Sequence, residues 1–335
     1  MTDLPVTDLP VTDLPVTESS PDVLRVQAGP LELANPILTA SGTFGYGLEF
    51  TDFVDLSRLG GICTKGLSLL PHAGNAPPRI CETPAGMLNA IGLQNVGVEA
   101  FLREKLPRLR ELSATVIANV WGDLEEDYVT VVQALEEAEG LAAIELNISC
   151  PNVEKGGMLF GNSPSATGSL VRRVRAVTGR PLVVKLSPNA PDLVESARAA
   201  REAGADALSL VNTFVGMSID PETARPRLSF GTGGLSGPAI RPLAIRMVYQ
   251  VARALPGTPL IGIGGISDLS DVLEFLAAGA TAVQVGTANF RDPGVSGRLV
   301  SELAAYCERR AVRVEDLVGR AHGPPPASLE AGAEG

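Results

Sequence analysis

The sequence predicts an α/β fold, a (β/α)8 TIM barrel. Short apolar runs and helix-like stretches alternate eight times between residues 36 and 309, which is typical of strand–helix units that close into a barrel. Hydrophobic residues make up 45% of the 335-residue chain, enough for one large core. Nearly every expected strand ends in an amide, an ammonium or glycines, and the carboxyl ends of barrel strands carry the chemistry.

The elements are expected in the following order. Strands are expected at Pro36–Ala40, Gly61–Thr64, Thr115–Val120, Ala143–Ile148, Leu182–Leu186, Ala207–Val211, Leu260–Ile263 and Ala282–Val285. Helices are expected at Glu49–Leu56, Glu99–Leu112, Leu124–Glu139, Ser165–Val177, Ala190–Ala203, Pro238–Ala254, Ser270–Ala278 and Val295–Arg309. A small hairpin at Val23–Leu33 is expected to cover the opposite end of the barrel.

Two insertions exceed ordinary loop length. Gly66–Val96 follows the second expected strand, and Thr213–Ser236 follows the sixth. Because long insertions after strands lie on the catalytic face of a barrel, these two are expected to form lids or substrate walls.

Composition and charge exclude several classes of function. The formal net charge of −11 opposes a nucleic-acid partner and an anionic membrane surface. No segment approaches about 20 continuous apolar residues, and no signal sequence is recognisable, so no membrane role is expected. The four cysteines show no disulfide-like spacing, which favours a cytoplasmic location. With only two histidines, zinc catalysis and histidine-based triads are unfavourable.

The termini differ from the rest of the chain. A unit Thr-Asp-Leu-Pro-Val repeats three times from Thr2 to Val16, and proline in every unit opposes a helix. Residues 1–22 are therefore predicted to be a disordered N-terminal extension. The proline-rich residues 321–335 are predicted to be a disordered tail. The single catalytic barrel domain is expected to span residues 23–320.

Polar residues and glycines lie at the carboxyl ends of the expected strands. In chain order they are Ser41, Lys65, Asn119, Asn147 with Cys150, Lys185, Asn212 with Thr213, Gly264-Gly265, and Gly286-Thr287. Such a circle predicts one shared ligand site. The glycine motifs after the last two strands predict a phosphate cradle of backbone N–H groups, to which Gly237 adds a further donor.

The residue types at this rim favour a flat, anionic ligand that forms hydrogen bonds. A lysine beside the pyrimidine edge of a flavin would stabilise the anionic reduced ring, and Lys185 suits that role. Lys65 could hold a substrate carboxylate. An alternative is that Lys185 forms a Schiff base, as in barrel aldolases, and nothing local decides between the two.

Cys150 is the strongest candidate for a catalytic residue. The apolar run Ala143–Ile148 ends in Asn147, Ser149 and Cys150, where a buried strand should end in turn residues. A buried free cysteine is often inert, but this one lies in a loop after a strand, with Gly156-Gly157 close behind. A catalytic base at this position would need a shifted pKa or a gated, water-free site.

Ten motifs in order make the chain similar to the class I dihydroorotate dehydrogenases, and specifically to their B-type catalytic subunits. The resemblance covers about residues 23 to 310. The motifs are Ala40–Gly47, Thr64–Gly66, Pro78-Arg79, Glu82–Asn95, Asn147–Val153, Val184–Asn189, Asn212-Thr213, Gly233–Ile240, Gly262–Gly265 and Gly286-Thr287.

The resemblance implies oxidation of (S)-dihydroorotate to orotate on one FMN per chain, in de novo pyrimidine (UMP) biosynthesis. It assigns Cys150 as the base. The implied substrate contacts are Lys65, Asn89, Ala90, Ile91, Gly92, Leu93, Asn147, Asn212 and Thr213. The implied FMN contacts are Ser41, Thr64, Lys65, Asn119, Asn147, Lys185, Val211, Gly237, Gly264, Gly265, Gly286 and Thr287. No metal is implied in this chain.

The B-type resemblance also implies partners. A homodimer would join an electron-transfer subunit that carries FAD and a 2Fe-2S cluster, forming a heterotetramer that reduces NAD. One alternative is an A-type enzyme that uses fumarate without a partner, and another is a related flavin barrel that reduces dihydropyrimidines. A flavin-free Schiff-base lyase and an inactive assembly barrel are alternatives of other classes.

Overall fold

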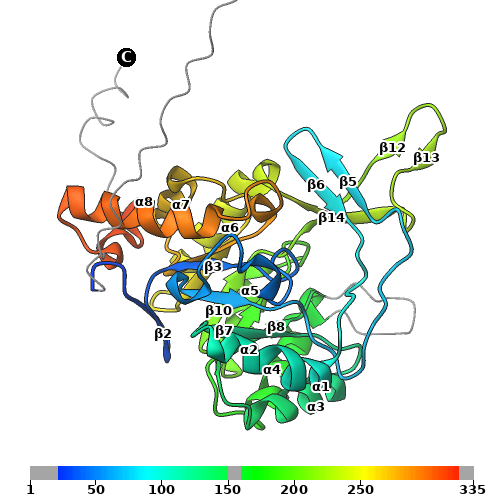
Figure 1. The fold of residues 1–335 in the computed structure, drawn as a ribbon, viewed down its shortest axis with the longest axis horizontal. Coiled ribbons are helices and arrows are strands. Elements are labelled where there is room, and N and C mark those ends of the chain that lie inside the picture. Colours follow the sequence, from blue (N-terminus) through cyan, green and yellow to red (C-terminus); the bar gives the residue numbers. More distant parts are fainter. Residues whose placement is uncertain (1–21, 150–159, 324–335) are drawn as a thin grey trace, which may run out of the picture.

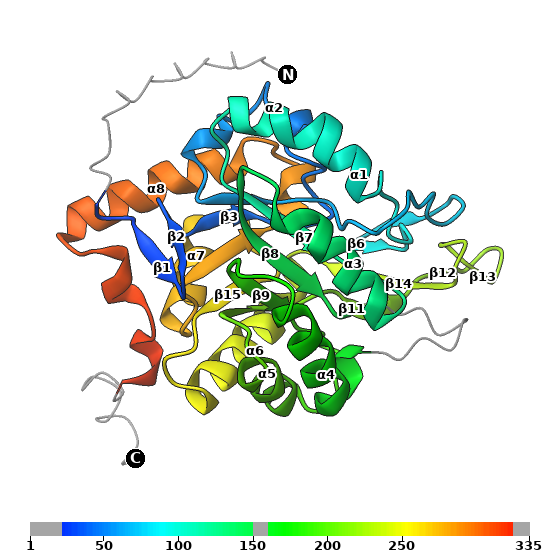
Figure 2. The same cartoon turned by 90° about the horizontal axis from the view of Figure 1, so that it is seen from below.

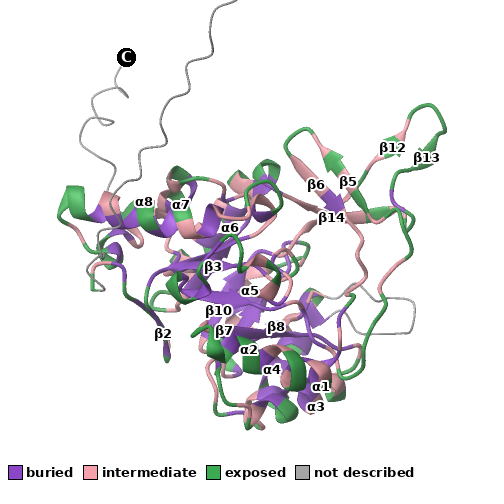
Figure 3. Cartoon of the chain, in the orientation of Figure 1, coloured by how far each residue is buried: buried purple, intermediate pink, exposed green. Residues whose placement is uncertain are grey.

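The strands form a closed parallel barrel. The computed structural model describes residues 22–149 and 160–323. Eight strands follow one another around the barrel: β3 (Ile37–Thr39), β4 (Gly61–Cys63), β7 (Val116–Val120), β8 (Leu141–Asn147), β9 (Leu182–Lys185), β10 (Ala207–Leu210), β15 (Leu260–Ile263) and β16 (Ala282–Val285). They are buried on both faces, as continuous apolar runs require (Figure 3). The predicted (β/α)8 barrel is confirmed.

Helices surround the barrel (Figure 2). They are α1 (Val98–Ala100), α2 (Leu106–Glu111), α3 (Glu125–Glu136), α4 (Pro164–Arg175), α5 (Leu193–Glu202), α6 (Arg241–Ala254), α7 (Leu269–Ala277) and α8 (Val295–Arg310). Side chains at the helix starts define several boundaries: the Asp192 carboxylate accepts the N–H of Glu195 before α5, and Asp268 accepts that of Asp271 before α7.

Two helix predictions need correction. The expected helix Glu49–Leu56 is wrong: two short 3-10 turns, η1 (Leu48–Phe50) and η2 (Leu56–Arg58), stand there instead. The Asp55 carboxylate accepts the N–H of Ser57 and so starts a second turn rather than continuing the first. The expected helix Glu99–Leu112 exists but contains a π-helical turn, η3 (Phe101–Lys105). Pro107 has no N–H for the carbonyl four residues earlier, which accounts for the irregular turn.

The N-terminal hairpin covers the amino end of the barrel, as expected. β1 (Val26–Ala28) and β2 (Leu31–Leu33) pair antiparallel. Gly29, at φ +65°, turns between them against the backbone of Asp206, directly before β10. The carbonyl of Val23 accepts the N–H of Val314, which starts the 3-10 turn η7 (Val314–Leu317). The hairpin therefore lies at the opposite end of the barrel from the two insertions, which follow the carboxyl ends of strands.

The two long insertions form one sheet, which the sequence did not predict. β5 (Ile80–Thr83) and β6 (Gly86–Asn89) come from the first insertion, and β11 (Phe214–Met217) and β14 (Thr232–Ser236) from the second. They pair antiparallel in the order β11-β14-β6-β5. A two-stranded extension, β12 (Ile219–Asp220) with β13 (Arg225–Pro226), projects beyond this sheet (Figure 1).

Short 3-10 turns complete the described chain: η4 (Phe160–Asn162), η5 (Pro238–Ile240), η6 (Thr287–Phe290) and η8 (Arg320–His322). The His322 ring stacks on Tyr249 at 4.2 Å between centroids, and its Nε2 lies 3.0 Å from the carbonyl of Ala278. Packing against the barrel therefore continues through residue 322, two residues into the segment predicted as the tail. Among the described residues, no helix is long and apolar enough to span a membrane.

Candidate active site

A fully buried carboxylate lies inside the barrel, two residues before β8 ends. Glu145 has no exposed surface. Its Oε1 accepts from Asn119 Nδ2 at 2.7 Å and from Cys63 Sγ at 3.1 Å. Its Oε2 accepts from Ser209 Oγ at 2.8 Å and from Gln284 Nε2 at 2.7 Å. The Lys185 ammonium lies 3.9 Å from Oε1. One carboxylate thus joins six of the barrel strands.

The surroundings keep this carboxylate ionised. Burial raises the pKa of Glu145, but the Lys185 ammonium and the hydrogen bonds from Cys63, Ser209 and Gln284 together bring it below its ordinary value. Burial, and then the neighbouring Glu145 charge, raise the pKa of the Cys63 thiol well above its usual range. Cys63 is therefore a neutral hydrogen-bond donor rather than a nucleophile.

Asn119 is held in one orientation by this carboxylate. Because a carboxylate only accepts hydrogen bonds, the amide must turn its Nδ2 toward Glu145. Its Oδ1 is buried without a hydrogen-bond partner among the described residues. The backbone N–H of Asn119 donates to Thr64 Oγ1 at 3.2 Å, so β4 and β7 present predicted cofactor contacts together. Ser41 is close by, since its backbone is hydrogen-bonded to the Cys63 thiol.

The predicted substrate contacts on β8 and after β10 touch one another. Asn212 Nδ2 donates to Asn147 Oδ1 at 3.1 Å, and the Asn147 carbonyl accepts from the Tyr128 hydroxyl at 2.7 Å. A Cβ on Gly234 would come within 2.1 Å of Thr213 Oγ1, so β14 packs directly on that side chain. Gly234 in turn pairs with Asn89 of β6.

The segment Asn89–Leu93 is fixed by its neighbours. Asn89 Nδ2 donates to the Gly234 carbonyl at 3.3 Å. Asn75 holds the next residues, since its Nδ2 donates to the Ala90 carbonyl at 2.9 Å and its N–H to the Ile91 carbonyl at 3.0 Å. Gly92 has φ +72° and lies against Asn75, where a Cβ would collide with it. Asn89, Thr213, Asn212 and Asn147 therefore form a continuous wall.

Lys65 follows β4 and is partly enclosed. Its N–H donates to the Gly45 carbonyl at 2.8 Å. Burial, and then the nearby positive charge of Arg79, lower the pKa of Lys65. The negative charge of a bound anion would compensate both effects, so the position suits a carboxylate ligand.

The glycine motifs form a cradle at the ends of β15 and β16. Gly264 and Gly265 have φ +135° and +77°, and a Cβ on Gly265 would lie 2.8 Å from the Gly237 carbonyl. Thr287 Oγ1 and Ser236 Oγ are 2.8 Å apart. Among the described residues, the backbone N–H groups have no acceptor at four positions: Gly264, Gly265, Gly286 and Thr287. Free N–H groups at this place in a barrel bind phosphate.

Two predicted site residues have not been described above. Cys150 lies outside the described residues. Val211 is buried directly after β10, and its N–H donates to the Ile263 carbonyl at 3.0 Å.

Sequence reasoning missed Glu145, Ser209 and Gln284. The one available signal was a charged or polar residue inside each of three apolar strands.

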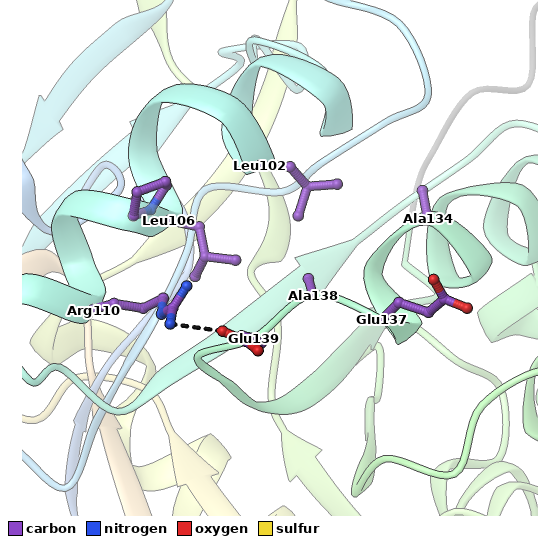
Figure 4. Close-up of a pocket in the computed structure, with 8 residues that line it drawn as sticks. Leu102, Leu106, Arg110, Ala134, Glu137, Ala138 and Glu139 are labelled. Atoms are coloured by element: carbon purple, nitrogen blue, oxygen red, sulfur yellow. Dashed lines mark hydrogen bonds and ion pairs between the residues drawn. The ribbon is translucent and has the colours of Figure 1, made fainter.

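A separate hollow lies in the outer helical layer (Figure 4). It has a volume of 340 Å³ and is closed on one side by the Arg110–Glu139 ion pair at 2.8 Å. Its lining is Leu102, Leu106, Pro107, Arg110, Ala134, Glu137, Ala138 and Glu139. None of these belongs to the rim residues, so this hollow is not the candidate site.

The rim residues fit a phosphorylated, flat cofactor such as FMN. The free N–H groups at the glycine motifs suit its phosphate. The buried acceptor Asn119 Oδ1 and the Lys185 ammonium suit the polar edge of its ring. Fold and site together define an α/β-barrel enzyme of the flavin-binding class.

Comparison with known proteins identifies the family. The family model for dihydroorotate dehydrogenase matches residues 23–306. The chain is 54% identical over 297 residues to the dihydroorotate dehydrogenase B (NAD(+)), catalytic subunit, of Geotalea uraniireducens, covering 88% of this chain and 97% of that protein. It is 53% identical over 302 residues to the same subunit of Geotalea daltonii, covering 90% and 98%.

A solved structure agrees in fold. DHODH from Eimeria tenella, in complex with ferulenol, superposes with a TM-score of 0.75 at 22% identity, covering 92% of this chain and 91% of that one. At this identity the likeness supports the fold alone. The family match and the curated relatives show that the chain belongs to the dihydroorotate dehydrogenase family and is an oxidoreductase.

The cradle yields a testable prediction. Gly265→Ala should weaken FMN binding about tenfold or more, because the new methyl group would press on Gly237 and Arg241 and displace the cradle. Fluorescence titration of the apoprotein with FMN measures this. Gly257→Ala is the matched control: Gly257 has a similar φ of +78°, but a Cβ there meets nothing within 4 Å. Equal FMN affinity in Gly265→Ala and wild type would exclude the cradle.

Proposed function

We propose that the chain oxidises (S)-dihydroorotate to orotate on FMN, as the catalytic subunit of a B-type dihydroorotate dehydrogenase in pyrimidine biosynthesis. The family and its curated relatives support the reaction. The observation that carries the assignment is the hydrogen-bonded wall of Asn147 and Asn212 beside the Glu145–Lys185 pair. We also propose that the protein is located in the cytoplasm.

The substrate would be bound by groups that match its chemistry. Dihydroorotate carries a carboxylate and a cyclic ureide with N–H donors and carbonyl acceptors. Lys65 would bind the carboxylate. The amides and backbone groups of the wall would bind the ureide and hold its C5–C6 bond in place. The proposed substrate contacts are Lys65, Asn89, Ala90, Ile91, Gly92, Leu93, Asn147, Asn212 and Thr213.

The cofactor would be held from its phosphate to its ring. The cradle would bind the phosphate, and Lys185 and Asn119 would contact the polar edge of the ring. The proposed FMN contacts are Ser41, Thr64, Lys65, Asn119, Asn147, Lys185, Val211, Gly237, Gly264, Gly265, Gly286 and Thr287. When bound, FMN accepts the hydride that leaves C6 of the substrate.

Cys150 would act as the base. As a thiolate it takes the proton from C5 while the hydride leaves C6, and the electron pair of the C5–H bond forms the C5–C6 double bond of orotate. Ser149 directly precedes Cys150, and its N–H donates to Asn147 Oδ1 at 3.3 Å. Ser149, the last described residue before the proposed base, is thus attached to the proposed substrate wall.

Partner subunits complete the proposal. The relatives are named catalytic subunits and NAD(+) enzymes. We infer a homodimer of this chain that binds a second subunit carrying FAD and a 2Fe-2S cluster, through which electrons reach NAD.

The identity of the electron acceptor tests whether the chain needs a partner subunit. Purified alone, the chain should reduce neither NAD nor fumarate at an appreciable rate with dihydroorotate, and an artificial dye should accept the electrons. Adding the electron-transfer subunit should restore NAD reduction. Rapid fumarate reduction by the chain alone would instead identify an A-type enzyme.

Removing the proposed base should remove the chemistry but not the cofactor. Cys150→Ala should lower kcat for dihydroorotate oxidation by roughly 10²- to 10⁴-fold, because general-base catalysis contributes about that much. FMN content, measured by absorbance, should stay at one per chain. Cys307→Ala, which removes a buried thiol in α8, is the control for loss of a thiol and should keep near-normal turnover. Near-normal turnover in Cys150→Ala would contradict the assignment.

The lowered pKa of Lys65 predicts how orotate binding depends on pH. Binding requires the ammonium, so affinity should fall as pH rises through the Lys65 pKa, at a lower pH than the ordinary value of 10.5. Calorimetry of the FMN-loaded protein measures this. Arg79→Gln should move the fall to higher pH, because the neighbouring charge is gone. Lys65→Ala should bind orotate weakly, and its orotate affinity should no longer decrease over this pH range. If the decrease persisted in Lys65→Ala, Lys65 would not belong to the substrate site.

A further inference from the structure

The buried carboxylate of Glu145 has no role in the reaction proposed above. It lies at the level of the barrel where the predicted cofactor contacts begin, two residues before Asn147 on the same strand. Burying an ionised carboxylate is costly unless hydrogen bonds and an opposite charge compensate it. Here four donors and one ammonium surround it. Because an apolar side chain could fill this position without any of these partners, we look for a functional role of the charge.

The two oxygens of the carboxylate have different partners. Oε2 is bound by Ser209 at 2.8 Å and Gln284 at 2.7 Å, neither of which is among the proposed cofactor contacts. Oε1 accepts from Asn119 at 2.7 Å and lies 3.9 Å from the Lys185 ammonium, and both of these are proposed cofactor contacts; it also accepts from the neutral Cys63 thiol at 3.1 Å. Oε2 is thus the anchored oxygen, and Oε1 is directed at the cofactor contacts.

The carboxylate decides what Asn119 and Lys185 present. An asparagine amide can rotate and exchange its donor for its acceptor, because the two ends have nearly the same shape. With one Nδ2 hydrogen bound to Oε1, the amide cannot flip, so Oδ1 stays the acceptor end, and it is buried without a partner among the described residues. Lys185 has 6% side-chain exposure, where an ammonium without a counter-ion is unfavourable. Glu145 supplies that counter-ion.

We propose that Glu145 is a positioning residue for FMN: it fixes Asn119 as a hydrogen-bond acceptor and holds the Lys185 ammonium in place as its counter-ion, both directed at the polar edge of the ring. This inference rests on the proposed function only in taking FMN as the cofactor. Glu145 touches neither FMN nor substrate in this proposal, and it acts through its two neighbours.

FMN affinity of the apoprotein tests the role without any turnover. Glu145→Gln should raise the Kd for FMN roughly 10- to 100-fold, as expected for loss of hydrogen bonds to a charged group. Glu145→Asp keeps the charge but withdraws it by one methylene group, so its Kd should fall between those of Glu145→Gln and wild type. Ser209→Ala removes a neutral donor from the anchored oxygen and should stay within about threefold of wild type. Wild-type affinity in folded Glu145→Gln would overturn the inference.

A double-mutant cycle separates positioning from general support of the fold. Because Glu145 acts through Lys185, Glu145→Gln should weaken FMN binding much less in a Lys185→Met background than in wild type. Fully additive effects on Kd would contradict the proposal, because they would mean that Glu145 acts independently of Lys185.

Stability gives a second readout if Glu145→Gln alone fails to fold. Lys185→Met leaves the Glu145 charge buried without its ammonium and should lower Tm. The double variant Glu145→Gln/Lys185→Met removes that charge and should have a higher Tm than Lys185→Met. A Tm at or below that of Lys185→Met would overturn the pairing. If the wild-type apoprotein bound no FMN, the proposed function itself would be wrong. If it bound FMN and Glu145→Gln bound it equally well, only the role of Glu145 would be wrong.

Discussion

One ionised carboxylate inside the barrel determines the chemistry of its rim. Barrel interiors are usually filled by branched apolar side chains in layers. Here one layer is polar, because Glu145 gathers donors from five other strands around it. The Lys185 ammonium and this carboxylate compensate each other's charge, and hydrogen bonds from Ser209 and Gln284 hold the carboxylate in place. The apolar barrel below supplies the rigid frame that holds these groups in register.

The two insertions build the other half of the site. β6 and β14 come from segments almost 150 residues apart in the chain, yet they pair and place Asn89 next to Gly234. β14 leads directly to Gly237 and the start of α6, and Ser236 meets Thr287 at the end of β16. The same sheet therefore contacts both the proposed substrate wall and the proposed phosphate cradle.

The barrel and most residues of the candidate site could be predicted from the sequence, because both depend on local patterns. The alternation of apolar runs and helical patterns gave the barrel, and the polar residues after each strand gave most members of the candidate site. The helix expected at Glu49–Leu56 was wrong, because Asp55 starts a separate turn there. The insertion sheet was missed, because pairing between distant segments leaves no local pattern. Glu145 was read only as part of an apolar strand, because its partners are far away in sequence.

Anaerobic mixing of the FMN-loaded chain with dihydroorotate is the most direct test of the central claim, that this rim holds a flavin facing a dihydropyrimidine. The account predicts that the flavin absorption band bleaches and that one orotate forms for each FMN. A purified chain that stays colourless with added FMN would contradict it. So would a yellow protein whose band is unchanged by dihydroorotate.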